Sequence, residues 1–252
     1  MKDAKGEIIL DDQVAANVLN KYFSSVFTIE NCSNIPEAKQ IFNYDDHTDG
    51  VDNICITEEI VFSKLNALNV NKSPGNDEIH PKMLYELRME IVKPLADLYR
   101  LSLDQGIVPK DWKEAAVIPL FKKGKRADPE NYRPISLTSL LCKILESIIK
   151  DNILCHLDKH SLIKSSQHGF TKGKSCLTNL LEFMEEVTEN LDVGIPVDVI
   201  YLDFAKAFDK VPFQRLFKKL TSHGIEGTVG EWIKNWLTGR RQKVSLNRKY
   251  SE

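Results

Sequence analysis

The sequence lacks several features that would place it in a specialised class of protein. It has no uninterrupted apolar run close to the ~20 residues that a membrane-spanning helix requires. Its first residues, MKDAKGEIILDD, mix charges where a secretory signal would carry an apolar segment. It also has no internal repeat and no low-complexity tract. We therefore expect a soluble globular protein of the cytoplasm and nucleus, neither secreted nor bound to a membrane.

Close cysteine pairs are also missing. The five cysteines are odd in number and scattered, which excludes a disulfide framework and favours reduced thiols. Cys155 and His156, with His160 one helical turn later, come nearest to a metal cluster. Without a C-x-x-C pair they are better interpreted as residues on a helix surface than as zinc ligands.

Arginine is absent from residues 1–60, which carry four lysines against twelve acidic residues, a net charge of -8. The whole chain has a net charge of -2, so the remaining residues carry +6. An acidic first part and a basic body suit a protein whose body binds a polyanion. A merely solvated surface is the alternative, and charge alone does not exclude it.

Hydrophobic periodicity predicts a mixture of helices and strands. Two apolar segments flank a basic connection in the pattern of a β-hairpin with a long tip. Residues 31–56 collect Asn, Asp, Pro and Gly and are predicted to be a partly disordered linker. The predicted order is α+β: helices 11–28, 57–69 and 81–104, hairpin strands 115–121 and 132–137, helices 138–157 and 176–191, a buried strand 197–203, helices 212–222 and 228–237, and a final strand or hairpin from residue 240.

Asp203 ends the predicted strand in the stretch VIYLDFAKAFDKVP. A buried carboxylate must become neutral, find a partner or hold a metal, and a strand-end carboxylate beside backbone carbonyls suits Mg²⁺. The alternative is a helix N-cap, which fits Asp209 better because Asp209 precedes the helix start at Pro212.

The hairpin tip concentrates positive charge. Lys122, Lys123, Lys125 and Arg126 lie within five positions, so they repel one another unless an anion is bound. A solvated tip is the alternative. A nucleotide P-loop at GFTKGKS is excluded, because Gly169 is one residue too close to Gly173-Lys174-Ser175 and no strand precedes it.

Four ordered blocks carry a family resemblance: KSPGNDEIHP, VIPLFKKGKRADPENYRPISL, SSQHGFTKGKSC and VIYLDFAKAFDKVP. Together they resemble reverse transcriptases of non-LTR retrotransposons, the LINE elements of the jockey type. The resemblance covers nearly all of residues 57–252. It implies the fingers of a right-hand polymerase over residues 57–196 and a truncated start of the palm over 197–252, after an N-terminal helix and acidic linker at 1–56.

The resemblance assigns roles to individual residues. Asp203 matches the first catalytic aspartate, which binds Mg²⁺ with help from the backbone carbonyl of Phe204, and Phe208 matches the aromatic residue under the incoming sugar. Lys122 or Lys123, with Arg133, match the cations that hold the triphosphate. Contact with nucleic acid is expected from Lys125, Arg126, Gln167, Gly169 and Phe170.

The implied reaction is two-metal nucleotide addition to a DNA primer on an RNA template, with deoxynucleoside triphosphates as substrates. The element RNA is the implied ribonucleoprotein partner. However, the P-Q-G block and the aromatic-x-Asp-Asp pair of the family are missing. Asp45-Asp46 lies upstream of Asp203, on the wrong side, and is interpreted as coincidence. The chain alone is therefore expected to be inactive. A non-catalytic nucleic-acid-binding remnant is the main alternative, and a phosphohydrolase using Asp203 and Asp209 is a weaker one.

Overall fold

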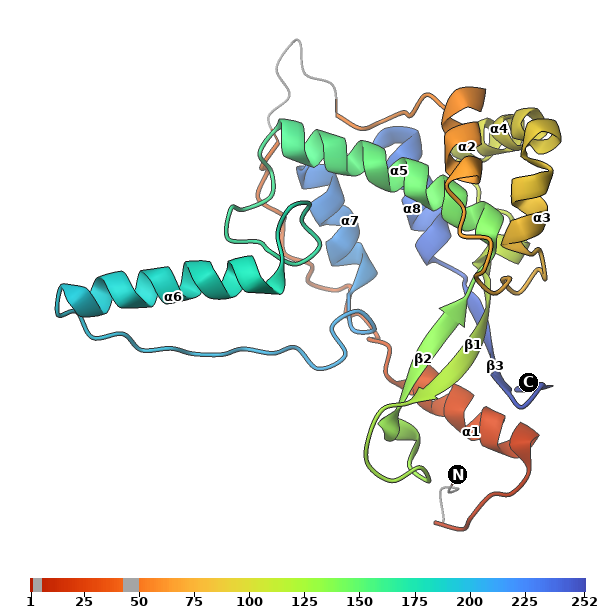
Figure 1. The fold of residues 1–252 in the computed structure, drawn as a ribbon, viewed down its shortest axis with the longest axis horizontal. Helices are drawn as coiled ribbons and strands as arrows, with labels where there is room; N and C mark the ends of the chain where they lie inside the picture. Colours follow the sequence, from red (N-terminus) through yellow and green to blue (C-terminus); the bar gives the residue numbers. More distant parts are fainter. Residues whose placement is uncertain (2–5, 43–49) are drawn as a thin grey trace.

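The computed structural model describes residues 1, 6–42 and 50–252, and its fold is α+β (Figure 1). Helices occupy the upper part of the view, and a small sheet with one helix lies below them. The elements are α1 (Asp12–Ser25), α2 (Glu58–Asn66), α3 (Pro81–Glu86), α4 (Arg88–Asp104), η1 (Lys110–Lys113), β1 (Glu114–Phe121), η2 (Pro129–Asn131), β2 (Tyr132–Leu137), α5 (Leu140–Lys159), α6 (Cys176–Asp192), α7 (Phe213–Ser222), α8 (Gly227–Leu237), β3 (Arg241–Leu246) and β4 (Lys249–Tyr250).

The sheet has four strands in the order β2-β1-β3-β4. β1 pairs with β2 as the predicted antiparallel hairpin, and β3 with β4 as a second hairpin. β1 also pairs in parallel with β3, so that strands far apart in sequence form one sheet. Helix α1 covers one face of this sheet, where its buried side chains pack against one from each central strand: Ala16, Leu19, Phe23, Val117 and Val244.

A second core lies between the helices and is larger. Tyr99 of α4, Leu145 of α5 and Trp232 of α8 are almost fully buried there. The polar atoms of the aromatic residues are paired, since Tyr99 Oη donates to the Leu141 carbonyl at 2.7 Å and Trp232 Nε1 donates to Ser102 Oγ at 3.0 Å. Buried polar groups that keep their hydrogen bonds do not oppose packing.

Local signals in the sequence produce most helix boundaries. The Asp11 carboxylate accepts from the Val14 N–H at 2.9 Å and begins α1, and the Thr57 hydroxyl accepts from the Ile60 N–H and begins α2. The helix predicted over 81–104 is in fact two helices. They meet at Leu87, whose N–H donates to Met83 while its carbonyl accepts from Ile91.

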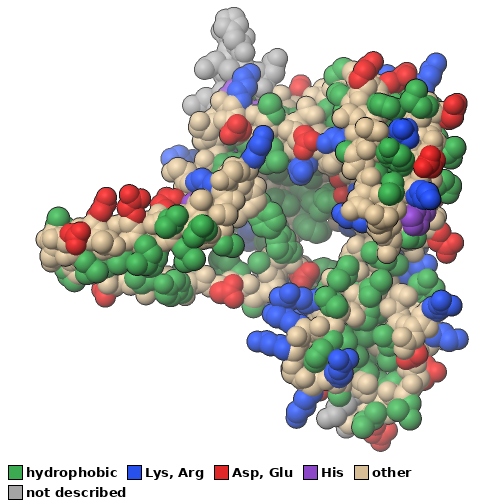
Figure 2. Space-filling view, viewed as in Figure 1, with side chains coloured by type: hydrophobic (Ala, Val, Ile, Leu, Met, Phe, Trp, Pro, Cys, Tyr) green, Lys and Arg blue, Asp and Glu red, His purple; other side chains and the backbone are tan. Residues whose placement is uncertain are grey.

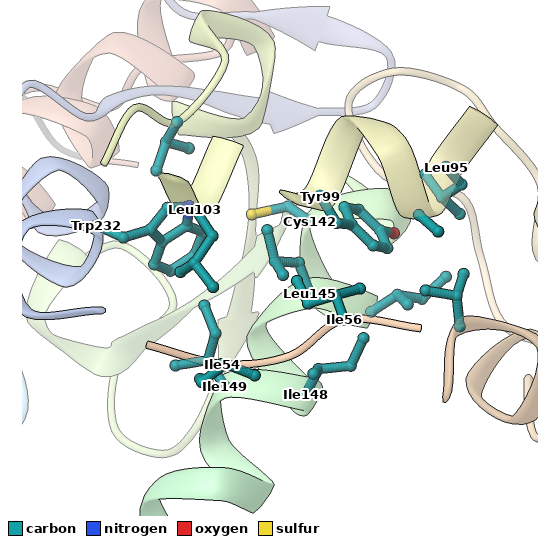
Figure 3. Packing of buried hydrophobic residues seen from close by; sticks show 14 of the residues in the cluster. Ile54, Ile56, Leu95, Tyr99, Leu103, Cys142, Leu145, Ile148, Ile149 and Trp232 are labelled. Atoms are coloured by element: carbon teal, nitrogen blue, oxygen red, sulfur yellow. The ribbon is translucent and has the colours of Figure 1, made fainter. Parts of the chain in front are cut away.

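The predicted linker is more ordered than expected in its described part. It has neither helix nor strand, but Phe42, Val51, Ile54 and Ile56 are buried. Figure 3 shows Ile54 and Ile56 among core residues of α4 and α5. The prediction of partial disorder is wrong for these positions, because single apolar residues in a polar stretch anchor it to distant elements.

The predicted buried strand 197–203 is also wrong. The segment is irregular, and Ile200, Tyr201 and Leu202 are more than 80% exposed. A strand needs a neighbour for its backbone hydrogen bonds, and within the described residues no segment pairs with this one. The boundaries at 56/57 and 196/197 stay predictions.

The prediction that Cys155 and His156 lie on a helix surface is correct for Cys155, which is exposed, and wrong for His156. All five cysteines are free. His156 is buried, with its Nε2 2.7 Å from the His223 carbonyl, and its ring packs against Phe42. Among the described residues, no helix is long and apolar enough to cross a bilayer.

Candidate nucleotide and nucleic-acid site

The hairpin orients two of the residues predicted to bind the triphosphate toward the same face of the sheet. Arg133 of β2 lies opposite Leu120 of β1, and the Lys122 N–H extends the ladder to the Asn131 carbonyl at 2.8 Å. Side chains alternate between the two faces of a sheet. Lys122 and Arg133 therefore share the face that α1 does not cover. Both are exposed.

The hairpin tip is held in shape by its own residues. Tyr132 Oη donates to the Arg126 carbonyl at 2.8 Å, and Asn131 Nδ2 donates to the Lys125 carbonyl at 2.9 Å. Gly124 has a φ of 90°, and a Cβ there would lie 2.7 Å from the Asn131 side chain. This geometry requires glycine, because a side chain would both strain the backbone and collide.

The tip cations have no acidic partners in the part of the chain that the structure describes. The Arg126 guanidinium lies 4.7 Å above the Phe121 ring, whereas Lys122, Lys123 and Lys125 are exposed. Figure 2 shows Lys and Arg side chains gathered around the lower part of the molecule, where the hairpin lies. Mutual repulsion between these cations would fall when an anion binds.

The loop before α6 presents Phe170 outward. Gln167 Nε2 donates to the Gly169 carbonyl at 2.9 Å and tightens the turn. Phe170 has a φ of 59°, which is unusual for a residue other than glycine, and it is 90% exposed. Its ring centroid lies 6.0 Å from that of Phe208, in an edge-to-face arrangement. The structure thus brings together two predicted site residues that are 38 positions apart.

His168 fixes this loop to α6, a role that sequence reasoning missed. Its imidazole is buried, with Nε2 2.6 Å from Glu182 Oε2 and Nδ1 3.0 Å from Thr178 Oγ1. In the sequence, the signal is that His168 lies between two predicted nucleic-acid-binding residues, Gln167 and Gly169. That position does not reveal the partners of His168 on α6.

The segment that carries Asp203 and Phe208 is exposed. Asp203 forms no hydrogen bond or ion pair with any described residue. The segment is tethered on its C-terminal side, where Lys206 Nζ lies 5.3 Å above the Tyr22 ring of α1 and Thr28 Oγ1 donates to the Lys210 carbonyl at 3.1 Å. These contacts hold it beside the helix that covers the sheet.

Asp209 does not cap α7, contrary to the alternative given for it. The cap comes from the stretch after α1 instead: the Glu30 carboxylate accepts from the N–H groups of Gln214 (2.8 Å) and Arg215 (3.2 Å). It also forms an ion pair with the Arg215 guanidinium at 2.9 Å. A carboxylate at a helix N-terminus is favoured by the exposed N–H groups and the helix dipole.

The described residues do not by themselves form a magnesium site. Among them, no group of three His, Cys, Asp or Glu side chains is close enough to hold an ion. Asp203 would supply one carboxylate, whereas Mg²⁺ prefers six oxygen ligands in octahedral geometry. Asp45 and Asp46 lie outside the described residues.

Comparison with known proteins identifies the family of this part of the chain. Residues 121–252 match the family model described as reverse transcriptase (RNA-dependent DNA polymerase). The match begins at the last residue of β1 and includes the tip, the loop before α6 and Asp203.

Curated relatives extend the similarity toward the N-terminus. The chain is 30% identical over 195 residues, 77% of its length, to the probable RNA-directed DNA polymerase from transposon BS of Drosophila melanogaster. It is 32% identical over 160 residues, 62% of its length, to the RNA-directed DNA polymerase from mobile element jockey of the same species. A 25% identity over 95% of the chain relates it to a putative 115 kDa protein in the type-1 retrotransposable element R1DM. The chain spans 21%, 17% and 22% of these relatives, about a fifth of their length. The chain therefore belongs to the reverse transcriptase family, among the members from non-LTR retrotransposons.

Proposed function

We propose that this chain carries the nucleotide-binding and template-facing part of an RNA-directed DNA polymerase from a non-LTR retrotransposon. The observation that supports this most directly is the register of the hairpin, which orients Lys122 and Arg133 to one open face of the sheet. Two cations on one face of the sheet suit the negative charge of a triphosphate. Lys123 lies next to them at the start of the tip.

Phe208 and the loop before α6 complete the proposed site. Phe208 underlies the sugar of the incoming deoxynucleotide and excludes a 2′-hydroxyl, while Phe170, in edge contact with it, faces the template together with Gln167 and Gly169. Lys125 and Arg126 bind the nucleic-acid backbone. The proposed partners are an RNA template, a DNA primer and, in the cell, the element RNA as a ribonucleoprotein.

Asp203 offers one carboxylate for the magnesium that supports nucleotidyl transfer in this family. The Phe204 carbonyl is the proposed second oxygen. Because the described residues do not complete such a site, we assign no step of the reaction to a metal here. The residues of this chain bind and orient the nucleotide and the template.

A primer-extension assay tests this proposal. The 252-residue chain, with an RNA template and a DNA primer, is expected to give no extension above an Asp203→Ala control, in either magnesium or manganese. A longer polypeptide that adds a P-Q-G block and an Asp-Asp block from the same reading frame should extend the primer, and Asp203→Ala should reduce this to background.

A second candidate function, a nucleic-acid-binding remnant without catalysis, is favoured by the carboxylate of Asp203, which is exposed and has no partner among the described residues. Sequencing beyond Glu252 separates the two candidates. An early stop codon favours the remnant, and an open frame with both blocks favours the polymerase. Extension by the longer polypeptide that is insensitive to Asp203→Ala would contradict the assignment of Asp203.

A further inference from the structure

The sheet has one open face, and its composition is unusual. On β1 and β2 this face carries apolar side chains that are partly exposed, Ile118 (43%), Leu120 (53%) and Ile135 (43%). They lie opposite the face that α1 buries, since Val117, which precedes Ile118 in β1, is fully buried against that helix. An exposed apolar sheet face is typical of a surface that binds a ligand or another macromolecule.

The second hairpin adds positive charge to the same face. Arg241 lies beside Glu114 and Lys243 beside Ala116 in the parallel pairing of β1 with β3. The alternate residue, Gln242, faces α1, because its side chain donates to Asn20 at 3.0 Å. Arg241 and Lys243 therefore face away from α1, as Lys122 and Arg133 do.

An aromatic residue lies among these cations. Tyr250 of β4 pairs with Ser245 and so belongs to the open face. It is 48% exposed, and Lys243 Nζ lies 4.7 Å above its ring. Glu114, the acidic residue of this face, lies at the N-terminal end of β1, where it accepts a long hydrogen bond from Asn76 (3.5 Å).

We infer that the open face of the sheet binds a single strand of RNA, with Arg241, Lys243 and Tyr250 extending the path that begins at Lys122 and Arg133. This inference rests on the proposed function. In the register, Lys243 lies four positions along the sheet from Arg133 and two strands away. Four positions correspond to about 13 Å, enough for a short run of nucleotides.

The composition of the face selects this partner over others. Single-stranded nucleic acid is bound by cations that follow the backbone and by aromatic or apolar side chains on which bases stack. A duplex hides its bases, so it would contact only the cations of this face and not the aromatic and apolar side chains. A protein partner would gain little from four cations with one acidic residue among them.

Binding can be measured by fluorescence anisotropy with a fluorescein-labelled 20-nucleotide oligo(U) over a series of KCl concentrations. The slope of log K against log salt is negative, and each lost single-strand phosphate contact makes it shallower by about 0.7. The double variant Arg241→Gln/Lys243→Gln should therefore make the slope shallower by about 1.4. Lys243→Arg should keep the wild-type slope.

Arg248→Gln/Lys249→Gln is the matched control. Arg248 lies in the turn of the same hairpin, and Lys249 pairs with Leu246, which packs on the α1 side. The control removes the same charge from the same hairpin but leaves the open face intact, so its slope should remain that of the wild type. Equal losses in the two double variants would overturn the inference.

Tyr250→Ala tests the stacking contact. It should weaken oligo(U) binding about five-fold or more without changing the slope. A 20-base-pair RNA duplex should be insensitive to this change, and an equal loss for duplex and single strand would overturn the single-strand assignment.

The two levels of the proposal fail differently. If changing Lys122, Lys123, Lys125 and Arg126 to Ala flattens the slope but the open-face variants do not, the inference falls and the proposed function stands. If the wild-type chain binds no RNA at low salt, both fall.

Discussion

Phe208 is the residue whose proposed role differs most clearly from simple packing. It is 79% exposed, and its ring contacts that of Phe170, which is itself exposed. An aromatic ring that contributes little buried area has little structural reason to be large. This supports a role in contact with substrate, on a segment that is tethered through Lys206 and Lys210.

The change Phe208→Val is expected to act on sugar selection. In a longer polypeptide that extends primers, the smaller side chain makes room for a 2′-hydroxyl, so the ratio of kcat/KM for a deoxynucleotide to that for the matching ribonucleotide should fall ~10-fold or more. Such a change corresponds to about 1.4 kcal/mol in transition-state binding. Steady-state incorporation kinetics with both nucleotides give the ratio.

Leu202→Val is the matched control for this prediction, because Leu202 is 87% exposed on the same segment. It should leave the ratio unchanged. In the 252-residue chain, Phe208→Val should change the free energy of unfolding by less than about 0.5 kcal/mol, as expected for an exposed site. A loss of roughly 1–3 kcal/mol, with both kcat/KM values falling together, would show that Phe208 is a packing residue.

Helix α7 depends on a cap from a distant part of the chain. The Glu30 side chain is only 10% exposed and accepts from two backbone N–H groups as well as from the Arg215 guanidinium. Glu30→Ala should therefore destabilise the protein by about 1–2 kcal/mol. Chemical denaturation followed by tryptophan fluorescence measures this difference.

Glu37→Ala is the control for the cap. Glu37 is exposed seven positions after Glu30 and forms no ion pair with a described residue. Its replacement should be close to neutral. Equal effects of the two changes would mean that loss of negative charge, and not loss of the cap, explains the destabilisation.

The sequence was informative about elements whose cause is local. Asp11 and Thr57 mark helix starts by residue type, and the two apolar segments around the basic tip predict the hairpin. The parallel pairing of β1 with β3 joins residues more than 120 positions apart, and no local pattern encodes it.

The wrong and missed predictions also depend on contacts between segments that are separate in the sequence. Residues 197–203 have the composition of a strand, but pairing is a property of two segments, and composition does not supply the second. The Glu30 cap and the His168 contact with Glu182 were missed because each partner lies on an element that only the fold brings near. The basic tip and the stretch around Asp203 could be predicted from sequence motifs. That Lys122 and Arg133 lie on one face of the sheet could be seen only from the register of β1 with β2.

At the scale of the whole molecule, the arm formed by α6 and the following segment is distinctive. In the described chain, no residue of α6 is buried, and Leu177, Leu180 and Leu181 are each about 60% exposed. The returning segment runs beside the helix (Figure 1), where the rings of Phe183 and Tyr201 lie 6.4 Å apart. Figure 2 shows hydrophobic side chains along this arm. An apolar surface of this kind favours association between chains.

The 252-residue chain is therefore expected to self-associate as its concentration rises. Sedimentation velocity over a concentration series should show a rising weight-average sedimentation coefficient, and Ile200→Lys/Leu202→Lys should lower it, because charged side chains oppose apolar contact. Leu10→Lys/Met89→Lys is the matched control: both residues are exposed (91% and 68%), but they lie before α1 and in α4, outside the arm. If the two double variants lowered association equally, the cause would be added net charge and not the arm. A single monomeric species at high concentration, with a cooperative thermal transition, would contradict the prediction and show that the arm is stable in water as it stands.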